Sequence, residues 1–474
     1  MKRNIFAKTT YIRWFVFAIW MVIWYLAAHF VGSELILPGP HSTLKALLKL
    51  LGTESFYFNV LWTIIRTALG IVISFVLGVA AAYLAFGSRA LREFLRLPVS
   101  FFKSIPVMAI IIYVILVVKA DWVAVVVCFL MCFPIAYTNM LNGLESLDKK
   151  QLELGAGLGL SSKQMNRFIV IPALNSHLRT ALNLITAMSW KVVVASEVLA
   201  IPKFSIGYQM LNSKYYLETA DLFAYIVVLI VLSLLMEKLV DLLACLRSDR
   251  LERALEKEIF GVSAADLPKN SREITFDHVD KTFVSEEGAE VKALDDFSCV
   301  FTPGITAVLA PSGAGKTTMA RIIKGFEKPD SGTVTGTEDA RIAYLFQEDR
   351  LLPWLTTKGN VLLAFLGGNL SGKDPEKAVS DMAEKLEIAD ALAMMPSELS
   401  GGMAHRAALG RTLLYGGGVL ILDEPFRGLD EDLRGRIIDD VKDELRPSDQ
   451  PKTVILITHD EELAEELADR VVRL

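Results

Sequence analysis

The sequence predicts a two-part fold, in which an all-α domain of six transmembrane helices precedes an α/β domain built around a glycine-rich loop. Two observations carry this prediction. Long apolar runs fill the first half of the chain, and each is close to the ~20 residues that a helix needs to cross a bilayer. In the second half, the glycine-rich stretch 310–318 lies between a short apolar run and a segment with helical spacing, which is the order strand, loop, helix.

The composition agrees with two such parts in one chain of 474 residues. Hydrophobic residues make up 53% of the sequence, which is too many for an ordinary soluble enzyme, and the length suits two or three domains. The net charge of −5 argues against nucleic acid as the main partner. The four cysteines are too few for a disulfide framework, so we expect small buried thiols.

Six apolar runs are the candidate membrane spans. The first is predicted to be a retained helix, because no small-residue cleavage site of a signal peptide follows it. Arginine and lysine residues gather after the second, fourth and sixth runs. By the positive-inside rule, the N-terminus, these loops and the α/β domain then lie in the cytoplasm. The predicted spans are residues 14–31, 60–86, 98–118, 122–141, 178–200 and 222–243.

Polar side chains within the fifth span form a candidate solute path, since charges in a bilayer are costly and commonly functional. The 3.6-residue helical period puts four of them on one face, with Lys191 on the adjacent face. Arg66, in the second span, is a further candidate. The alternative is that Arg66 and Glu197 are structural, and either pair across helices or extend to a membrane interface. The four residues of this polar stripe are Asn183, Thr186, Trp190 and Glu197.

The glycine-rich loop has the residue types of a phosphate-binding P-loop. Its glycines let backbone N–H groups turn toward phosphate oxygens, and the following helix contributes the positive end of its dipole. Lys316 is expected to reach the β- and γ-phosphates, and the Thr317 hydroxyl is expected to hold Mg²⁺. Ala310 stands where the usual pattern has its first glycine. The predicted nucleotide-binding residues of the loop are Ser312, Gly313, Ala314, Gly315, Lys316, Thr317 and Thr318.

The acidic pair Asp423 and Glu424 follows four apolar residues, as at a strand that ends in a hydrolytic site. An aspartate there can hold Mg²⁺ through water, and a glutamate can orient and deprotonate an attacking water. His459 and Gln347 are expected to read the γ-phosphate. Taken singly, each of these residues also fits core packing, a turn or a solvated strand end.

In their order and spacing, residues 273–474 resemble the nucleotide-binding domain of an ABC transporter, and this resemblance implies further roles. Phe283 stands where the family has an aromatic residue that stacks on adenine. Gln347 matches the Q-loop glutamine, which touches Mg²⁺ and the permease interface, and His459 matches the switch histidine. Residues 351–355 resemble those of nitrate, sulfonate and taurine importers. The signature loop is matched by Ser400, Gly401 and Gly402, with Met403 where glutamine is commonest, and the D-loop by Gly428, Leu429 and Asp430.

The loop between the fourth and fifth predicted spans resembles the EAA loop of bacterial ABC import permeases. In that family the loop forms a short coupling helix that seats in a groove of the ATPase. Glu153, Gly159 and Pro172 match its spacing, and Gly159 and Pro172 are expected to bound a short rigid element. The expected domains are a membrane domain at 1–246 with the coupling loop at 145–175, a linker at 247–272 and an ATPase at 273–474.

These resemblances imply half of a type I ABC importer, since one chain carries one permease copy and one ATPase copy. In this family the signature loop of one ATPase meets the phosphate loop of another, so a homodimer is expected. The expected function is ATP- and Mg²⁺-dependent uptake of a small solute, delivered by an extracytoplasmic solute-binding protein, across a bacterial-type inner membrane. A small anion such as a sulfonate, taurine or nitrate is the first candidate solute. The alternatives are an uncharged heterocycle, an exporter, or a non-transporting membrane ATPase.

Overall fold

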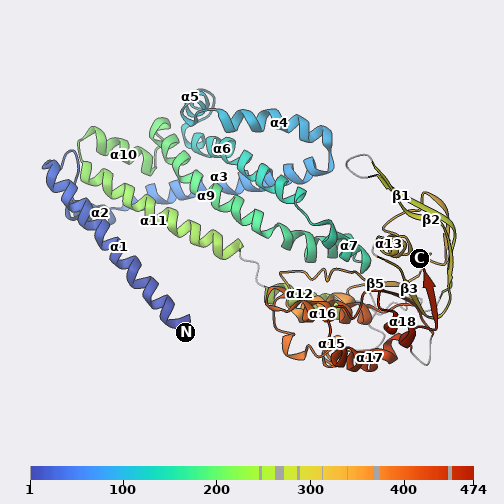
Figure 1. Ribbon diagram of the computed structural model, residues 1–474. Coiled ribbons are helices and arrows are strands. Elements are labelled where there is room, and N and C mark those ends of the chain that lie inside the picture. The colour runs from blue at the N-terminus through green and yellow to red at the C-terminus, as the bar shows by residue number, and fades with distance from the viewer. Residues whose placement is uncertain are drawn as a thin grey trace. The chain divides into compact units, whose positions relative to one another are not determined.

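The computed structural model describes residues 2–244, 248–261, 272–284, 289–311, 313–338, 340–367, 374–446 and 451–474. The chain divides into two compact units (Figure 1). Unit 1 comprises Met1–Ser146 and Leu174–Cys245, and unit 2 comprises Leu147–Ala173 and Leu246–Leu474. The loop that resembles the EAA loop therefore belongs to the same unit as the α/β domain.

Unit 1 is all-α in its described part, because its apolar runs satisfy their backbone groups within helices (Figure 1). Short helices join the long ones at their ends. The long helices are α1 (Lys2–Val31), α3 (Glu54–Gly87), α6 (Ala120–Glu145), α9 (Ile171–Ala200) and α11 (Thr219–Ala244), and the shorter ones are α2 (Pro40–Leu51), α4 (Arg89–Ser104), α5 (Val107–Val117) and α10 (Ile206–Tyr215).

Five helices of the described part are long and apolar enough to cross a membrane, and a sixth span exists only if α4 and α5 are counted together. The predicted span 98–118 is therefore not one continuous helix, since α4 and α5 meet at a bend of 107°. Ile105 has extended backbone at this break, with φ −76 and ψ 137. The reason is Pro106, because a residue that precedes proline is disfavoured in the helical region.

The core of unit 1 forms where α3 and α6 pack side by side (Figure 1). Two glycines of α3 allow this close approach. A Cβ atom at Gly70 would overlap Cys128, and one at Gly78 would overlap Ala136. Small residues at such positions let two membrane helices approach closely, so these glycines serve packing.

Unit 2 contains two sheets. A three-stranded antiparallel sheet has the order β2–β1–β4, and a five-stranded parallel sheet has the order β5–β6–β7–β3–β8. The parallel strands end at one edge, where ligands of such sheets commonly bind. The strands are β1 (Ile274–Val284), β2 (Glu290–Phe301), β3 (Gly304–Leu309), β4 (Ser331–Thr335), β5 (Ile342–Leu345), β6 (Val419–Asp423), β7 (Thr453–Thr458) and β8 (Arg470–Arg473).

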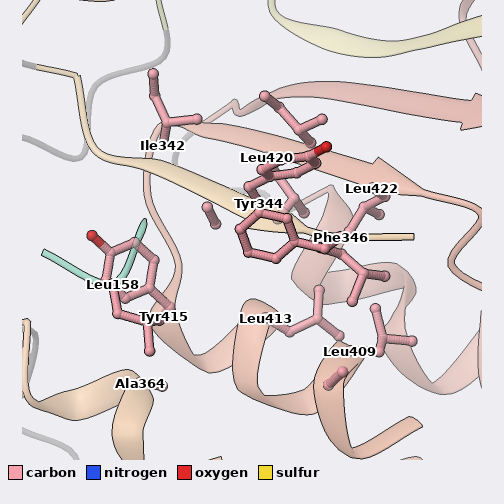
Figure 2. Close-up of a cluster of buried hydrophobic side chains, with 14 of the residues drawn as sticks. Leu158, Ile342, Tyr344, Phe346, Ala364, Leu409, Leu413, Tyr415, Leu420 and Leu422 are labelled. Atoms are coloured by element: carbon pink, nitrogen blue, oxygen red, sulfur yellow. The ribbon is translucent and has the colours of Figure 1, made fainter. Parts of the chain in front are cut away.

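Helices pack on the parallel sheet, and in its main core side chains of β5, β6 and the helix 401–415 interdigitate (Figure 2). The helices of unit 2 are α7 (Lys149–Gly157), α8 (Ser162–Met165), the π-helical turn η1 (Asn166–Val170), α12 (Ser248–Gly261), α13 (Lys316–Lys324), α14 (Thr357–Leu362), α15 (Pro375–Lys385), α16 (Gly401–Tyr415), α17 (Glu431–Leu445) and α18 (Glu461–Leu467).

The segment predicted as a linker, 247–272, begins in the structure with a packed helix. Leu255 and Ile259 of α12 are fully buried in the core of unit 2. Glu252 accepts a hydrogen bond from the backbone N–H of Thr356 at 2.7 Å, at the start of α14. Residues 248–261 are thus part of the folded α/β unit, and residues 262–271 of the predicted linker lie outside the described residues.

Candidate nucleotide site and coupling loop

The glycine-rich loop joins the end of β3 to the start of α13. Gly313 and Gly315 have φ values of +89 and +87, which side chains other than hydrogen rarely adopt. A Cβ atom at Gly315 would also overlap the backbone oxygen of Ala293. Glycine is therefore required at 315 by both conformation and space. Ser312, one of the predicted binding residues, lies outside the described residues.

A cavity of about 450 Å³ opens over this loop, at the edge where the parallel strands end. It brings together the predicted phosphate, metal and hydrolysis residues from four separate stretches of the chain. The sequence separates these stretches by up to about 150 residues, and the parallel sheet unites them. The residues that line the cavity are Ala293, Gly313, Gly315, Lys316, Thr317, Thr318, Gln347, Asp423, Glu424, Arg427 and His459.

Asp423 lies at the end of β6 and is 3% exposed. Burial is the main reason that its pKa is raised to about 6, and the neighbouring charge of Glu424 adds to the effect. The Thr317 hydroxyl hydrogen-bonds to this carboxylate. Its Oδ2 atom is buried without a hydrogen-bond partner in the described part of the chain. A buried carboxylate with a free oxygen beside a hydroxyl fits the oxygen ligands that Mg²⁺ prefers.

Glu424 has a left-handed backbone, with φ +53, which is strained for a residue with a side chain. Its Oε1 atom lies 2.7 Å from Nδ1 of His459, so two residues that were predicted separately are in direct contact. The Glu424 backbone N–H donates to the Ile457 carbonyl of β7 at 2.9 Å. The strained residue is thus held by the neighbouring strand with its carboxylate in the cavity.

Two cations lie beside these acids. Lys316 Nζ donates to the carbonyl of Ala310, which keeps its ammonium inside the loop. Arg427 also lines the cavity, and its charge partly offsets the rise in the pKa of Asp423. Sequence reasoning missed Arg427, although an arginine directly after a predicted acidic strand end was a usable signal.

The remaining predicted nucleotide residues do not line this cavity. Phe283 lies on β1 and is 39% exposed, with Lys281 Nζ 5.4 Å from its ring centroid. Ser400 caps α16 by accepting from the Met403 N–H at 3.3 Å, and Asp430 caps α17 by accepting from the Leu433 N–H at 2.8 Å. Ser400 and Gly401 are exposed and Gly402 is half-buried, and none of the three lines the cavity of its own chain.

The loop that resembles the EAA loop is held by a carboxylate between two guanidinium groups. Glu153 of α7 accepts from Arg321 at 2.8 Å and 3.0 Å and from Arg350 at 2.8 Å. These contacts, that of Arg321 first, hold the pKa of Glu153 at about 2. Arg321 lies on the helix that begins with Lys316, and Arg350 follows Gln347 closely. Sequence reasoning found Glu153 but neither arginine, because nothing local distinguishes them from solvated cations.

Apolar contacts complete this docking. Leu158 is 6% exposed and lies beside Tyr415, at the end of α16 (Figure 2). Gly159 follows with φ +64 and nothing closer than 3.6 Å to a built Cβ, so its left-handed backbone is the reason for glycine. The chain therefore turns at the end of α7 through a left-handed residue, a conformation that glycine adopts without strain.

Pro172 does not end a short element as expected, because the helix continues through it from Ser162 to Ala200. Proline has no N–H, so it leaves the carbonyl of Phe168 without a helical donor. The indole Nε1–H of Trp354 donates to this carbonyl at 2.9 Å. Pro172 thereby leaves free a carbonyl through which Trp354, in segment 351–355, holds the loop.

The residues of the candidate solute path all lie in unit 1. Arg66 is 4% exposed and donates to Glu197 at 3.0 Å, to the Phe204 carbonyl at 2.7 Å and to Asp121 at 3.2 Å. Glu197 is fully buried and also accepts from Thr63 and from the Gly207 N–H. These contacts support the structural alternative for this pair. Elsewhere on α9, Lys191 is exposed, Asn183 donates to Asp241 at 3.4 Å, and Trp190 Nε1 and Thr186 Oγ1 are buried without a partner among the described residues.

Substitution of Glu153 by glutamine is expected to lower solute uptake about tenfold while ATP binding persists, because two arginines lose a partly buried partner. Uptake and hydrolysis measured in the same proteoliposomes check this. Glu327→Gln is the control, since Glu327 also pairs with Arg321 at 3.2 Å but lies outside the loop.

A pH dependence is expected for the same contact. Because the pKa of Glu153 is near 2, its ion pairs should hold the loop at any pH above about 4.5 and should be lost only as the pH falls toward 2. Wild-type uptake in the Glu153 variant would contradict the coupling assignment.

Comparison with known proteins finds similar sequences for both parts of the chain. Residues 74–248 match the family model of the binding-protein-dependent transport system inner membrane component, and residues 294–427 match the ABC transporter model. The aliphatic sulfonates import ATP-binding protein SsuB 1 of Rhodococcus jostii (strain RHA1) is 38% identical over 190 residues, covering 39% of this chain and 74% of that protein. The SsuB protein of Delftia acidovorans is 37% identical over 187 residues, covering 39% and 73%. A solved dimeric ATP-binding cassette with ADP and Pi has a TM-score of 0.38 and 28% identity over 42% of this chain and 94% of that one.

The chain belongs to the ABC transporter family. It is a fused permease and ATPase of the importer type, in which an ATP-hydrolysing cassette drives transport across a membrane. The two-part fold and the class of protein predicted from the sequence are thereby confirmed.

Proposed function

We propose that this chain is one half of a homodimeric importer that moves a small solute into the cytoplasm. The observation that carries the proposal is the docking of Glu153 between Arg321 and Arg350. A loop of the import permease type is thus bound to the helix that begins at the phosphate loop. A movement of α13 on ATP binding would therefore act on the loop directly, as coupling of hydrolysis to transport requires.

The homodimer is supported by the residues that the cavity lacks. Ser400 and Gly401 lie exposed at the start of α16, where free backbone N–H groups and the helix dipole suit an anion. A second copy would bring these groups against the γ-phosphate held by the first. Two equivalent ATP sites would then form at a shared two-fold interface.

Within each site, different residues of the chain have different roles in ATP hydrolysis. Lys316 and the loop amides bind the phosphates, and Phe283 stacks on the adenine. Thr317, Gln347 and Asp423 would hold Mg²⁺, which when bound neutralises charge on the phosphate oxygens. The Glu424 carboxylate accepts a proton from water as the water oxygen attacks the γ-phosphorus, and the bond to the β-phosphate oxygen breaks. The contact between His459 and Glu424 orients that carboxylate.

The names of the relatives support a class of solute. Two are named for the import of aliphatic sulfonates, and a protein of Synechocystis sp. for the import of nitrate. We therefore propose a small oxyanion or sulfonate for this chain, delivered by an extracytoplasmic solute-binding protein. Arg66 adds no support for an anion, because its guanidinium is already bound by Glu197 and Asp121. The excess of arginine and lysine in alternate loops supports an inner membrane orientation with the ATPase in the cytoplasm.

The test is ATP-driven uptake by the full chain in proteoliposomes. A candidate solute-binding protein loaded with a sulfonate, taurine or nitrate is added to one side, and uptake and ATP hydrolysis are followed together. Stimulation of both by one loaded protein is expected, and the unloaded protein serves as control. Hydrolysis that no loaded protein changes, without any uptake, would favour a non-transporting ATPase.

A further inference from the structure

His405 lies on α16, five residues after Ser400, and is 2% exposed. Its two ring nitrogens contact two different parts of the cassette. Nε2 lies 2.9 Å from the backbone oxygen of Glu424, and Nδ1 lies 2.8 Å from Oδ1 of Asp349. A carbonyl oxygen can only accept, so Nε2 carries a hydrogen and donates it. The imidazole therefore bridges the residue that carries the proposed base to the segment that follows Gln347.

The bond to Glu424 falls on a peptide that needs support. With φ +53, Glu424 occupies a sparsely populated backbone region that persists only where the surroundings hold it. Its N–H is held by Ile457 of β7 at 2.9 Å. Its carbonyl is held by His405 and, at 3.2 Å, by the Arg427 N–H of the same turn. His405 is therefore the side chain that fixes the far end of the strained peptide.

The bond to Asp349 continues toward the coupling loop. Arg411 donates to the Asp349 and Arg350 carbonyls at 2.8 Å and 3.2 Å, so this segment is held against α16. Arg350, the next residue, also has a left-handed backbone, with φ +46, and contacts Glu153 at 2.8 Å. A continuous set of contacts within unit 2 thus runs from Glu153 through Arg350, Asp349 and His405 to the main chain of Glu424.

We propose that His405 is a positioning residue for hydrolysis, which holds the Glu424 main chain and makes the orientation of its carboxylate depend on the segment that docks Glu153. This inference rests on the proposed role of Glu424 as base. His405 touches neither water nor phosphate in this role and lies outside the cavity lining. Because its effect passes through Glu424, its loss should slow the chemical step and leave nucleotide binding unchanged.

Two amide variants separate the two bonds. In His405→Gln the side-chain amide can place an N–H where Nε2 was, which keeps the bond to Glu424. In His405→Asn the amide N–H lies where Nδ1 was, which keeps only the bond to Asp349. For the asparagine variant we expect kcat for ATP to fall about tenfold with KM within about twofold of wild type, the size expected for one lost hydrogen bond. For the glutamine variant we expect kcat within about twofold of wild type.

The link to Asp349 is tested by a double-mutant cycle on the full chain in proteoliposomes. Asp349→Ala and His405→Asn should each lower kcat, and the double variant should be no slower than the slower single variant. His278→Asn is the matched control, since His278 makes the same kind of contact to Asp296, at 2.6 Å, on an exposed strand. It should change neither kcat nor KM.

Each outcome decides the matter. Equal loss of kcat in the glutamine and asparagine variants, with unchanged melting temperatures, would show that the donor to Glu424 is not what matters. Additive effects of Asp349→Ala and His405→Asn would remove the link between the two residues. If Glu424→Gln hydrolyses ATP normally, the proposed function of Glu424 fails. If that variant is inactive while His405→Asn keeps wild-type kcat, only the inference about His405 fails.

Discussion

Substitution of Glu424 by glutamine is expected to lower ATP hydrolysis by about two to four powers of ten, the usual share of a general base, and to leave ATP bound. Glutamine keeps the volume and the hydrogen bond to His459 but cannot take a proton from water. Because the left-handed backbone at φ +53 is strained for either side chain, the substitution should not change the cost of that conformation. Phosphate release and retained radiolabelled ATP, measured on the full chain in lipid, check both halves of the prediction.

The control for this substitution is Glu466→Gln. Glu466 is an exposed glutamate on α18 outside the cavity, so its variant should hydrolyse ATP at the wild-type rate. Turnover of Glu424→Gln within about tenfold of wild type would mean that another group accepts the proton. Loss of ATP binding together with hydrolysis would instead point to a disturbed cavity.

Mixing a Lys316→Ala copy with a Ser400→Arg copy is expected to restore hydrolysis that neither copy has alone. If each ATP site takes Lys316 from one chain and Ser400 from its partner, a mixed dimer has one intact site and one doubly impaired site. Random pairing makes about half of the dimers mixed, so activity should reach about a quarter of wild type when the sites act independently. Hydrolysis by co-reconstituted copies with two different affinity tags measures this.

The control for mixing is a single chain that carries both substitutions, combined with the Lys316→Ala copy. Every site then lacks Lys316, and some sites also lack Ser400, so activity should stay at background. Proven pairing of the two single variants without any recovery would overturn the shared-site arrangement. Full activity of a monodisperse single chain would overturn the homodimer itself.

Much of the nucleotide site could be predicted from the sequence because its parts are local. Lys316 and Thr317 start a helix directly behind the loop glycines, and Asp423 and Glu424 end an apolar strand. In such stretches the backbone conformation itself brings the groups together. The apolar runs of the first half are local signals of the same kind. The exception is the predicted span 98–118, which the break at Pro106 divides between α4 and α5.

Only the tertiary structure decided which distant groups meet. Glu153 and Arg321 are 168 residues apart, and Arg66 and Glu197 are 131 apart, yet each pair shares a hydrogen bond. The contact between His405 of α16 and the Glu424 carbonyl, at the end of β6, likewise has no local pattern that predicts it. The physical reason is that the role of a charged or hydrogen-bonding side chain depends on its partner. Which partner it meets depends on the order of the strands and on how the helices pack. Residue types and short-range periodicity therefore determined the fold class and the phosphate loop. Packing decided the ion pairs of Glu153, the ion pairs of Arg66 with Glu197 and Asp121, and the hydrogen bond from His405 to the Glu424 carbonyl.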